Sequence, residues 1–256
     1  MLREQRRNEM EQFIIKRQNV SMEELCAHFG VSLNTVRADV AELCRRGGVR
    51  KIYGGAQSVT PKPAPLFSQR ALTRTGTKRA IAMAAARHIE NGDILYIDAG
   101  TTTMHLMEFL PPSLELTIIT ANIYLIDAVL DKPGITLVVL PGILQRRTNS
   151  LMDNSTVEVL GRYQCSKAFL GVSGITEDGR LNVSSFAEQA LKQAAVRQSR
   201  QTILLADSLK FGEYNLLSYG SLREMDLVIT DDGIPPLYEA YCESHAIPLE
   251  TVSLDG

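Results

Sequence analysis

Residues that form cross-links or metal centres are scarce in this sequence. Its four cysteines, Cys26, Cys44, Cys165 and Cys242, stand far apart and form no C-x-x-C pair. This spacing argues against a disulfide framework and a metal site, so we expect no bound metal and reduced thiols. The four histidines form no catalytic constellation and no nucleophile motif is present, so we predict no catalytic residue.

Long hydrophobic runs are also absent. No uninterrupted apolar stretch approaches the roughly 20 residues of a membrane span. The N-terminal stretch MLREQRRNEMEQ carries charges without an apolar core behind them, so we do not expect a secretory signal. A hydrophobic fraction of 45% and a charged fraction of 22% are ordinary for a globular chain. We therefore predict a cytoplasmic protein with no membrane partner and no cofactor.

Charge is unevenly distributed along the 256 residues. Residues 1–57 hold ten lysines or arginines against seven acidic residues, although the whole chain has a net charge of -2. A small basic module attached to a larger acidic one fits nucleic-acid contact at one end. Between them, VTPKPAPLF has a proline at every second position and predicts an extended connector. We expect a DNA-binding domain at 1–57, a linker at 58–69 and an α/β domain at 70–256.

The first 57 residues predict three helices and a hairpin. The helices are expected over about 3–18, 21–29 and 32–47, and Ser21 with Glu24 forms an S-x-x-E capping box before the second. The basic stretch VRKIYGGA then predicts a strand, a turn and a return strand. Three short helices followed by a basic hairpin predict a winged helix-turn-helix.

The third of these helices is expected to enter the major groove of double-stranded operator DNA. Arg37 can donate two hydrogen bonds to guanine and Asn34 can pair with adenine, whereas hydroxyl and basic side chains suit phosphates. An alternative leaves these groups as solvated charges on an adaptor that binds protein instead of DNA. The predicted DNA-binding residues are Ser32, Asn34, Thr35, Arg37, Arg45, Arg46, Arg50, Lys51 and Tyr53.

Beyond the connector, strand-like and helix-like segments alternate. A helix near 77–90 precedes ILYID, and the later strand-like runs are LELTIIT, ITLVVLPG, KAFLGV, QTILLAD, DLVIT and PLETVS. Helical patterns such as FAEQALKQAAVRQS separate them. This alternation predicts an α/β fold with a mostly parallel sheet covered by helices. Such sheets bind ligands at the carboxyl ends of their strands.

Polar and small residues follow several of these strands. DAGTTTMHL comes directly after ILYI, and its small residues, hydroxyls and a helix starting near Thr103 suit a phosphate or another anion. Lys210 could neutralise that anion, and Asp98 or Asp207 could accept hydrogen bonds from sugar hydroxyls. Glu188 and Lys192 share a helix face, either as ligand contacts or as a surface ion pair. The predicted effector-binding residues are Asp98, Gly100, Thr101, Thr102, Thr103, Asn122, Gly142, Ser173, Glu188, Asp207 and Lys210.

The N-terminal module resembles that of the DeoR family of bacterial transcriptional regulators. The matching residues are Val31, Ser32, Thr35, Val36, Arg37, Asp39, Gly54, Gly55 and Ala56. Ala38 stands where the family usually has a second arginine, and Tyr53 where it usually has histidine. We expect Ala38 to alter the operator sequence or the grip on phosphates.

The resemblance continues through the second domain and so covers nearly the whole chain. The matching residues are Lys78, Ile81, Ala82, Asp98, Gly100, Thr101, Thr102, Thr120, Asn122, Asp207, Lys210, Phe211 and Gly212. Pro141, Asp153 and Leu209 depart from the family's usual glycine, glycine and serine, which leaves the identity of the ligand open.

This resemblance implies a sensor domain with a fold similar to ribose-phosphate isomerases and CoA transferases. It implies a homo-oligomeric repressor of a carbohydrate-utilisation operon, which a phosphorylated sugar releases from its operator. The alternative is a sugar-phosphate isomerase or transferase with an appended DNA-binding module, in which Glu188 or Asp98 acts as a general base.

Overall fold

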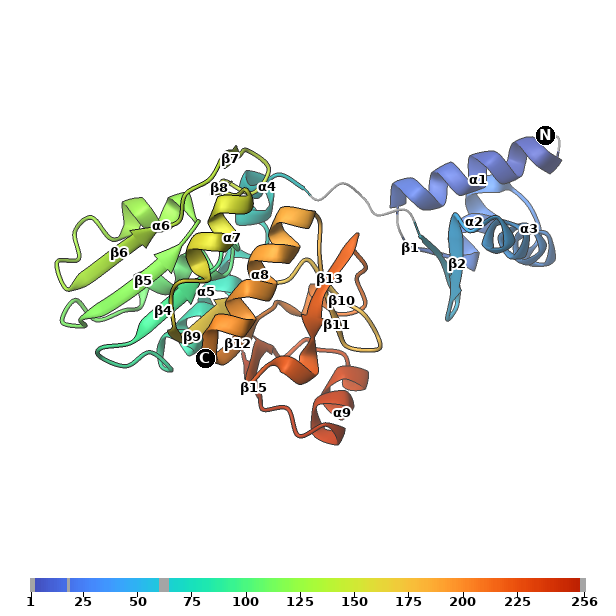
Figure 1. The fold of residues 1–256 in the computed structure, drawn as a ribbon. Helices are drawn as coiled ribbons and strands as arrows, with labels where there is room; N and C mark the ends of the chain where they lie inside the picture. The colour runs from blue at the N-terminus through green and yellow to red at the C-terminus, as the bar shows by residue number, and fades with distance from the viewer. Residues whose placement is uncertain (1–2, 18, 60–64, 254–256) are drawn as a thin grey trace. The chain divides into compact units, whose positions relative to one another are not determined.

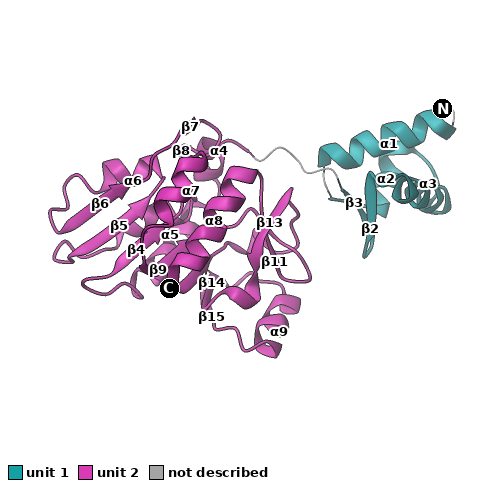
Figure 2. Ribbon diagram, viewed as in Figure 1, with its two compact units in different colours: residues 1–63 teal, residues 64–256 magenta. Residues whose placement is uncertain are grey.

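A computed structural model of the protein describes residues 3–17, 19–59 and 65–253. The chain divides into two compact units, residues 1–63 (unit 1) and 64–256 (unit 2), coloured separately in Figure 2. The centre of the predicted linker, residues 60–64, lies outside the described residues. Its two ends carry regular structure, because Ser58 closes a strand and Phe67 begins a helix.

Unit 1 contains the three predicted helices, α1 (Arg3–Arg17), α2 (Met22–Phe29) and α3 (Leu33–Arg46). The capping box before α2 is present, since the Ser21 hydroxyl accepts from the Glu24 N–H and the Glu24 carboxylate accepts from the Ser21 N–H. Gly30 and Gly47 end α2 and α3 in the left-handed region that glycine adopts without strain. Local capping chemistry therefore fixes where these helices begin and end.

The hairpin of unit 1 consists of β2 (Val49–Ile52) and β3 (Gly55–Ser58). A third strand that the sequence did not predict, β1 (Asn19–Ser21), pairs antiparallel with β3 and completes a sheet of order β1-β3-β2. Three helices followed by a strand-turn-strand confirm the winged helix-turn-helix. The buried core of unit 1 draws on all three helices, and its members include Met10, Ile14, Leu25, Val36, Val40 and Leu43.

Unit 2 is built on a seven-stranded sheet of order β15-β14-β12-β9-β4-β5-β6, in which every ladder is parallel (Figure 1). The predicted mostly parallel sheet is thus confirmed. Its strands are β4 (Ile94–Ile97), β5 (Leu116–Thr120), β6 (Ile135–Val139), β9 (Cys165–Leu170), β12 (Ser199–Leu205), β14 (Leu227–Asp231) and β15 (Leu249–Val252).

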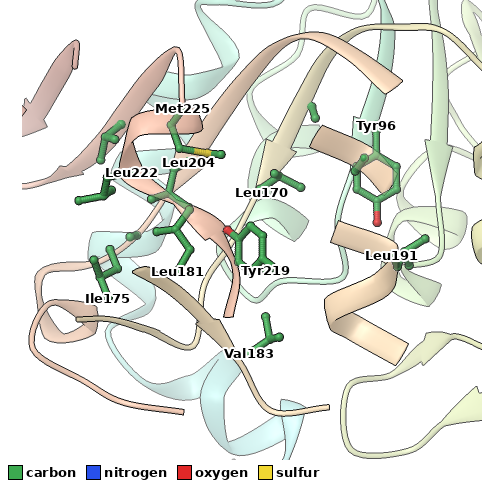
Figure 3. Close-up of a cluster of buried hydrophobic side chains, with 14 of the residues drawn as sticks. Tyr96, Leu170, Ile175, Leu181, Val183, Leu191, Leu204, Tyr219, Leu222 and Met225 are labelled. Carbon is green, nitrogen blue, oxygen red and sulfur yellow. The ribbon is translucent and has the colours of Figure 1, made fainter. Parts of the chain in front are cut away.

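Both faces of this sheet are covered, which explains why its strands read as apolar runs. Leu95 and Ile97 of β4 join the core under α5 (Thr75–Ala86) and α6 (Ile123–Ala128), whereas Tyr96 faces the other way. Figure 3 shows Tyr96 beside Leu191 of α8 (Phe186–Gln198) in this second core.

Several short elements complete unit 2. The helix expected from Thr103 is a 3-10 helix, η1 (Thr103–Glu108), instead of an α-helix. The remaining helices are α4 (Phe67–Leu72), α7 (Asn154–Leu160), α9 (Pro236–Ser244), η2 (Ser208–Lys210) and η3 (Leu222–Glu224). The remaining strands are β7 (Leu144–Gln145), β8 (Ser150–Leu151), β10 (Gly174–Ile175), β11 (Arg180–Val183) and β13 (Leu217–Ser221). No helix among the described residues is long and apolar enough to span a bilayer.

Candidate DNA interface and effector cleft

The third helix of unit 1, α3, has one buried and one exposed face. Val36, Val40 and Leu43 are buried, whereas Asn34 and Arg37 near its N-terminal end are exposed. The Ser32 hydroxyl caps the helix, because it accepts from the Thr35 N–H at 3.3 Å and shares a hydrogen bond with the Thr35 hydroxyl at 2.9 Å. The helix therefore presents its N-terminal end to solvent, as a recognition helix does.

Asp39 attaches α3 to α1. Its side chain is 1% exposed, and its two carboxylate oxygens accept hydrogen bonds from Nε of Arg6 and Nε of Arg7, both at 2.8 Å. Burial works against the charged form, but the two arginines outweigh it and hold the pKa of Asp39 below its ordinary value. Sequence reasoning matched Asp39 to a family motif but gave it no role.

The predicted phosphate-binding cations fall into two groups. Arg45 pairs with Glu42, Arg46 pairs with Glu4, and Nε of Arg50 donates to Oε1 of Gln57 at 2.6 Å. These three already have partners within unit 1. The other two cations, Arg37 and Lys51, are exposed and have no ion-pair partner among the described residues. The predicted DNA contacts Asn34 and Tyr53 are exposed as well.

The cleft of unit 2 lies where the order of the central sheet reverses. From β4 the chain proceeds outward through β5 and β6, whereas β9, β12, β14 and β15 proceed in the opposite direction. Ligands of parallel sheets bind at such a switch point, outside the carboxyl ends of the strands. Residues that follow β4, β9 and β12 meet here. The cleft is lined by Arg70, Asp98, Ala99, Gly100, Thr101, Thr102, Gly171, Val172, Ser173, Glu188, Lys192, Leu205, Ala206, Asp207 and Lys210.

Of the predicted effector residues, all line this cleft except Thr103, Asn122 and Gly142. Thr103 and Asn122 are completely buried, and both bond to the Asp98 segment, through the Thr103 hydroxyl and the Asn122 amide. Gly142 lies in the loop before β7, where an added Cβ would approach the Met152 nitrogen to 2.7 Å. These three residues support the walls and do not form them.

Asp98 is the best-bonded residue of the cleft. Oδ1 accepts from the Gly100 N–H at 2.8 Å and from the Thr103 hydroxyl at 2.7 Å. Oδ2 accepts from the Gly171 N–H at 2.7 Å and from the Lys192 ammonium. Burial disfavours its charge, yet Lys192 and these donors hold the pKa of Asp98 below its ordinary value. With four donors already bound, the carboxylate organises the loop and is poorly placed to accept from a sugar hydroxyl or to act as a base.

The expected pair between Glu188 and Lys192 does not form. The Lys192 ammonium donates to Asp98 and, at 2.9 Å, to the Gly171 carbonyl, and it lies 5.3 Å from the centre of the Tyr219 ring. Glu188 instead accepts weak hydrogen bonds of 3.4 Å from the Ser184 N–H and hydroxyl. The two side chains share the cleft wall but have different partners.

Residues that line the cleft also carry unused donors. The N–H groups of Thr101 and Thr102 have no hydrogen-bond acceptor among the described residues, and both hydroxyls stand on the same loop. Lys210 has no ion-pair partner within the described part of the chain. Backbone N–H groups beside a lysine ammonium form an arrangement that binds anions such as phosphate.

Two further cations near the cleft were missing from the predicted site. Arg70 lines it from α4, and burial lowers the pKa of this guanidinium against the opposing effect of Glu188 and Asp98. Lys78 is 3% exposed, and burial lowers its pKa to about 8, with Asp207 opposing and Lys210 adding to the shift. Lys78 was visible in a sequence motif, whereas the six-residue helix α4 is too short for a periodic signal around Arg70.

No metal site accompanies these groups. In residues 3–17, 19–59 and 65–253, histidine, cysteine and carboxylate side chains do not gather in threes around a position that could hold a metal ion.

A winged helix-turn-helix followed by an α/β domain with a polar cleft is the arrangement of a DNA-binding regulator with a sensor domain. Residues 6–62 match the sequence model of the DeoR-like helix-turn-helix domain, and residues 73–232 match that of the DeoR C terminal sensor domain. The chain belongs to the DeoR family and is a DNA-binding transcriptional regulator, not an enzyme.

Relatives match along almost their whole length. The HTH-type transcriptional regulator IolR of Bacillus subtilis (strain 168) is 33% identical over 239 residues, which cover 93% of this chain and 95% of that protein. The glycerol-3-phosphate regulon repressor of Escherichia coli (strain K12) is 30% identical, with coverage of 98% and 99%. The putative aga operon transcriptional repressor of Escherichia coli O157:H7 is 28% identical, with coverage of 90% and 87%.

Solved structures resemble the chain only distantly. Ribose 5-phosphate isomerase A from Methanocaldococcus jannaschii aligns with a TM-score of 0.38 and 15% identity over 52% of this chain and 53% of that one. The eIF2B beta subunit from Chaetomium thermophilum aligns with a TM-score of 0.43 and 16% identity over 83% and 59%. These likenesses are too weak to assign a function.

Proposed function

We propose that this protein represses a carbohydrate-utilisation operon and that a phosphorylated sugar, bound in the cleft of unit 2, releases it from the operator. A regulator of this kind acts in the cytoplasm, where the operator is. The names of two relatives, a glycerol-3-phosphate regulon repressor and a putative aga operon repressor, support the repressor role. The first name also supports a phosphorylated effector.

The observation that carries the effector class is the set of unused donors around the cleft. The N–H groups of Thr101 and Thr102, the Lys210 ammonium and the Arg70 guanidinium border it. The other lining cation, Lys192, is neutralised by Asp98, and Asp207 lies 3.6 Å from Arg74. Among the described residues that line the cleft, the charges without an ion-pair partner are therefore those of Arg70 and Lys210, opposed by Glu188 alone. This positive balance favours a dianionic phosphate over a neutral sugar.

For DNA, we propose that Asn34 and Arg37 contact base edges, that Ser32, Thr35, Arg45, Arg46, Arg50 and Lys51 contact phosphates, and that Tyr53 lies at the tip of the wing. The exposure of these residues on α3 and on the hairpin supports this division, with Thr35 and Arg50 half-buried. Arg45, Arg46 and Arg50 would exchange or share their present partners when they reach a phosphate.

Release must work through linkage, because an effector shifts an equilibrium only by binding one state more tightly than the other. We also propose a homo-oligomer, since one small module makes few base contacts and pairing two modules adds affinity and half-site specificity. Light scattering measures the mass of the protein in solution and so tests this oligomer. A monomeric mass at the concentration at which the protein binds DNA would contradict the proposal.

The test of the effector class is a thermal-shift screen of the full chain with phosphorylated sugars and the same sugars without phosphate. We expect a phosphorylated sugar to raise the melting temperature, because a ligand that binds only the folded state stabilises it. The double variant Thr101→Val, Lys210→Ala should lose this response.

A matched double variant, Thr136→Val with Lys132→Ala, changes the same residue types outside the cleft and should keep the response. The phosphorylated sugar that stabilises the protein should also weaken its binding to a duplex selected from random DNA. Equal stabilisation by the sugar without phosphate would contradict the proposed effector class.

A further inference from the structure

α4 is the first helix of unit 2 and begins three residues after Ala64, the last residue of the undescribed segment. It carries Arg70, whose side chain lines the cleft together with Asp98, Glu188 and Lys210. Nε of Arg70 is buried and has no hydrogen-bond partner. A buried donor of this kind favours any ligand that supplies an acceptor.

The contacts of α4 are concentrated at its first residue, Phe67, whose side chain is 1% exposed. The Phe67 N–H donates to the Arg147 carbonyl at 2.9 Å, and the Phe67 ring stacks on Tyr124 with 4.7 Å between ring centres. The Lys78 ammonium donates to the Arg70 carbonyl, while Leu72 at the end of the helix is 84% exposed. A helix of six residues is unstable by itself, so its order depends on such contacts.

The junction between α4 and α5 is also tied to the cleft. Arg74 has a φ of 51°, a left-handed conformation that a non-glycine residue keeps only when its surroundings impose it. Its guanidinium donates to the Ser208 hydroxyl at 2.9 Å and to Oδ2 of Asp231 at 2.8 Å. Ser208 follows Asp207 of the cleft wall, so the junction after α4 is attached to a residue that adjoins the ligand site.

We propose that Arg70 is the residue through which an anion in the cleft acts on α4, the first helix of unit 2. The bound anion supplies the acceptor that Nε of Arg70 lacks and thereby stabilises α4. The order of α4 then reports occupancy of the cleft. This inference rests on the anion site of the proposed function and adds the element that responds to binding.

Lys210 provides the natural contrast. It borders the same cleft, but it lies in η2 and makes no hydrogen bond or ion pair with α4 among the described residues. Lys210 should therefore contribute to anion affinity without linking the anion to α4. Replacing each cation in turn should therefore separate affinity for the anion from the effect of the anion on α4.

The experiment measures hydrogen exchange of residues 65–74 in the full chain, with and without saturating inorganic phosphate, and the affinity for phosphate by calorimetry. In the unchanged protein, bound phosphate should slow exchange of α4 by at least about threefold, because ordering closes its hydrogen bonds. Arg70→Met should bind phosphate about tenfold more weakly and show no slowing at saturation. Lys210→Met should also bind more weakly, yet show the full slowing at saturation.

The possible failures are distinguishable. If phosphate binds but α4 exchanges at the same rate with and without it, or if Arg70→Met retains the slowing, the inference is wrong and the anion site stands. If calorimetry detects no phosphate binding to the unchanged protein, the proposed anion site is wrong, and so is the inference that depends on it. Arg70→Gln, which retains a polar side chain, repeats the comparison should the methionine variant fail to fold.

Discussion

Asp39 and Asp98 are both almost fully buried, and each accepts hydrogen bonds from basic side chains of another element. Asp39 fixes the recognition helix to α1, and Asp98 fixes the loop after β4 to the end of β9 and to Lys192 on α8. A buried carboxylate without partners is costly, so each tie holds only while its basic partner is in place. One aspartate thus positions the recognition helix of unit 1, and the other positions the loop that lines the cleft of unit 2.

Replacing Asp39 with asparagine should destabilise unit 1 by about 3 kcal/mol, because Arg6 would be left partly buried without a counter-charge and Arg7 would keep only the more distant Glu4, at 3.8 Å. Native-state hydrogen exchange of α1 and α3 in the full chain measures this loss. Glu23→Gln removes an exposed carboxylate from the neighbouring helix and should leave exchange unchanged.

The same substitution predicts a pH dependence with a definite sign. The pKa of Asp39 is lower in the folded than in the unfolded chain. Its contribution to stability is therefore complete above the ordinary carboxylate pKa and is lost as the pH falls through the folded-state value. Protection of α1 in Asp39→Asn should vary less over this acidic range than in the unchanged protein. Equal slopes in both proteins would contradict the ion-pair assignment.

Sequence reasoning named most lining residues of the cleft but not their partners. It offered Glu188 as an ion-pair partner of Lys192, beside a ligand role, because i,i+4 spacing is the only neighbour relation that a helix shows in sequence. The actual partner, Asp98, is 94 residues away. Arg6 and Arg7 are likewise more than 30 residues from Asp39. Such ties depend on how elements pack, which no local spacing encodes.

The wing of unit 1 shows how one glycine fits a sheet together. Gly55 begins β3, the central strand, and a Cβ there would stand 2.4 Å from the Val20 carbonyl oxygen of β1. Its neighbour Gly54 has a φ of +72° at the turn, but open space surrounds it. The first glycine is required by contact, and the second by conformation.

Gly55→Ala should therefore separate β1 from β3 and weaken DNA binding more than Gly54→Ala, which carries only the backbone strain of about 1 kcal/mol. The affinity of the full chain for a selected duplex and hydrogen exchange of residues 19–21 measure the two effects. A Gly54→Ala variant that lost more affinity than Gly55→Ala would show that the turn, not the strand contact, limits the wing.

Elements were predictable to the extent that their signals are local. Long amphipathic helices and the apolar strands of the parallel sheet carry such signals, and the structure confirms them. β1 and β13 form only because strands more than 30 residues away in the chain pair with them. Their absence from the sequence prediction reflects that dependence.

Considered as one chain, the protein separates its charges. Unit 1 carries the exposed cations of α3 and the hairpin, and the rest of the chain is acidic overall. The contacts with DNA phosphates should therefore come from unit 1, and the affinity for DNA should fall steeply with salt, because each phosphate contact releases counterions.

Lys51→Ala should reduce the slope of log affinity against log salt by about 1, with little change in preferred sequence. Arg37→Ala should instead cost about 1–3 kcal/mol of binding and relax the sequence preference. Arg200→Ala, which removes an exposed arginine from unit 2, serves as the control and should alter neither. Fluorescence anisotropy with selected and scrambled duplexes over a salt series measures all three. A salt-independent affinity would contradict the phosphate contacts.

The order of the strands was the part of the architecture that the sequence did not reveal. Alternating helices and strands predicted a parallel sheet, and polar residues at strand ends predicted a site. Neither observation told which strands are neighbours, because β4 and β9 pair across about 70 intervening residues. The reversal of order at this pair is what places the ends of β4, β9 and β12 around one cleft.

That central pairing also sets the order in which the protein acquires its properties during synthesis. The ribosome delivers unit 1 and strands β4 to β6 before β9 and β12, which supply the opposite wall of the cleft. A nascent chain therefore holds its complete helix-turn-helix module well before the cleft of unit 2 can form. A product truncated ahead of β12 would lack one wall of that cleft, so the proposed response to an effector would be the last property that translation completes.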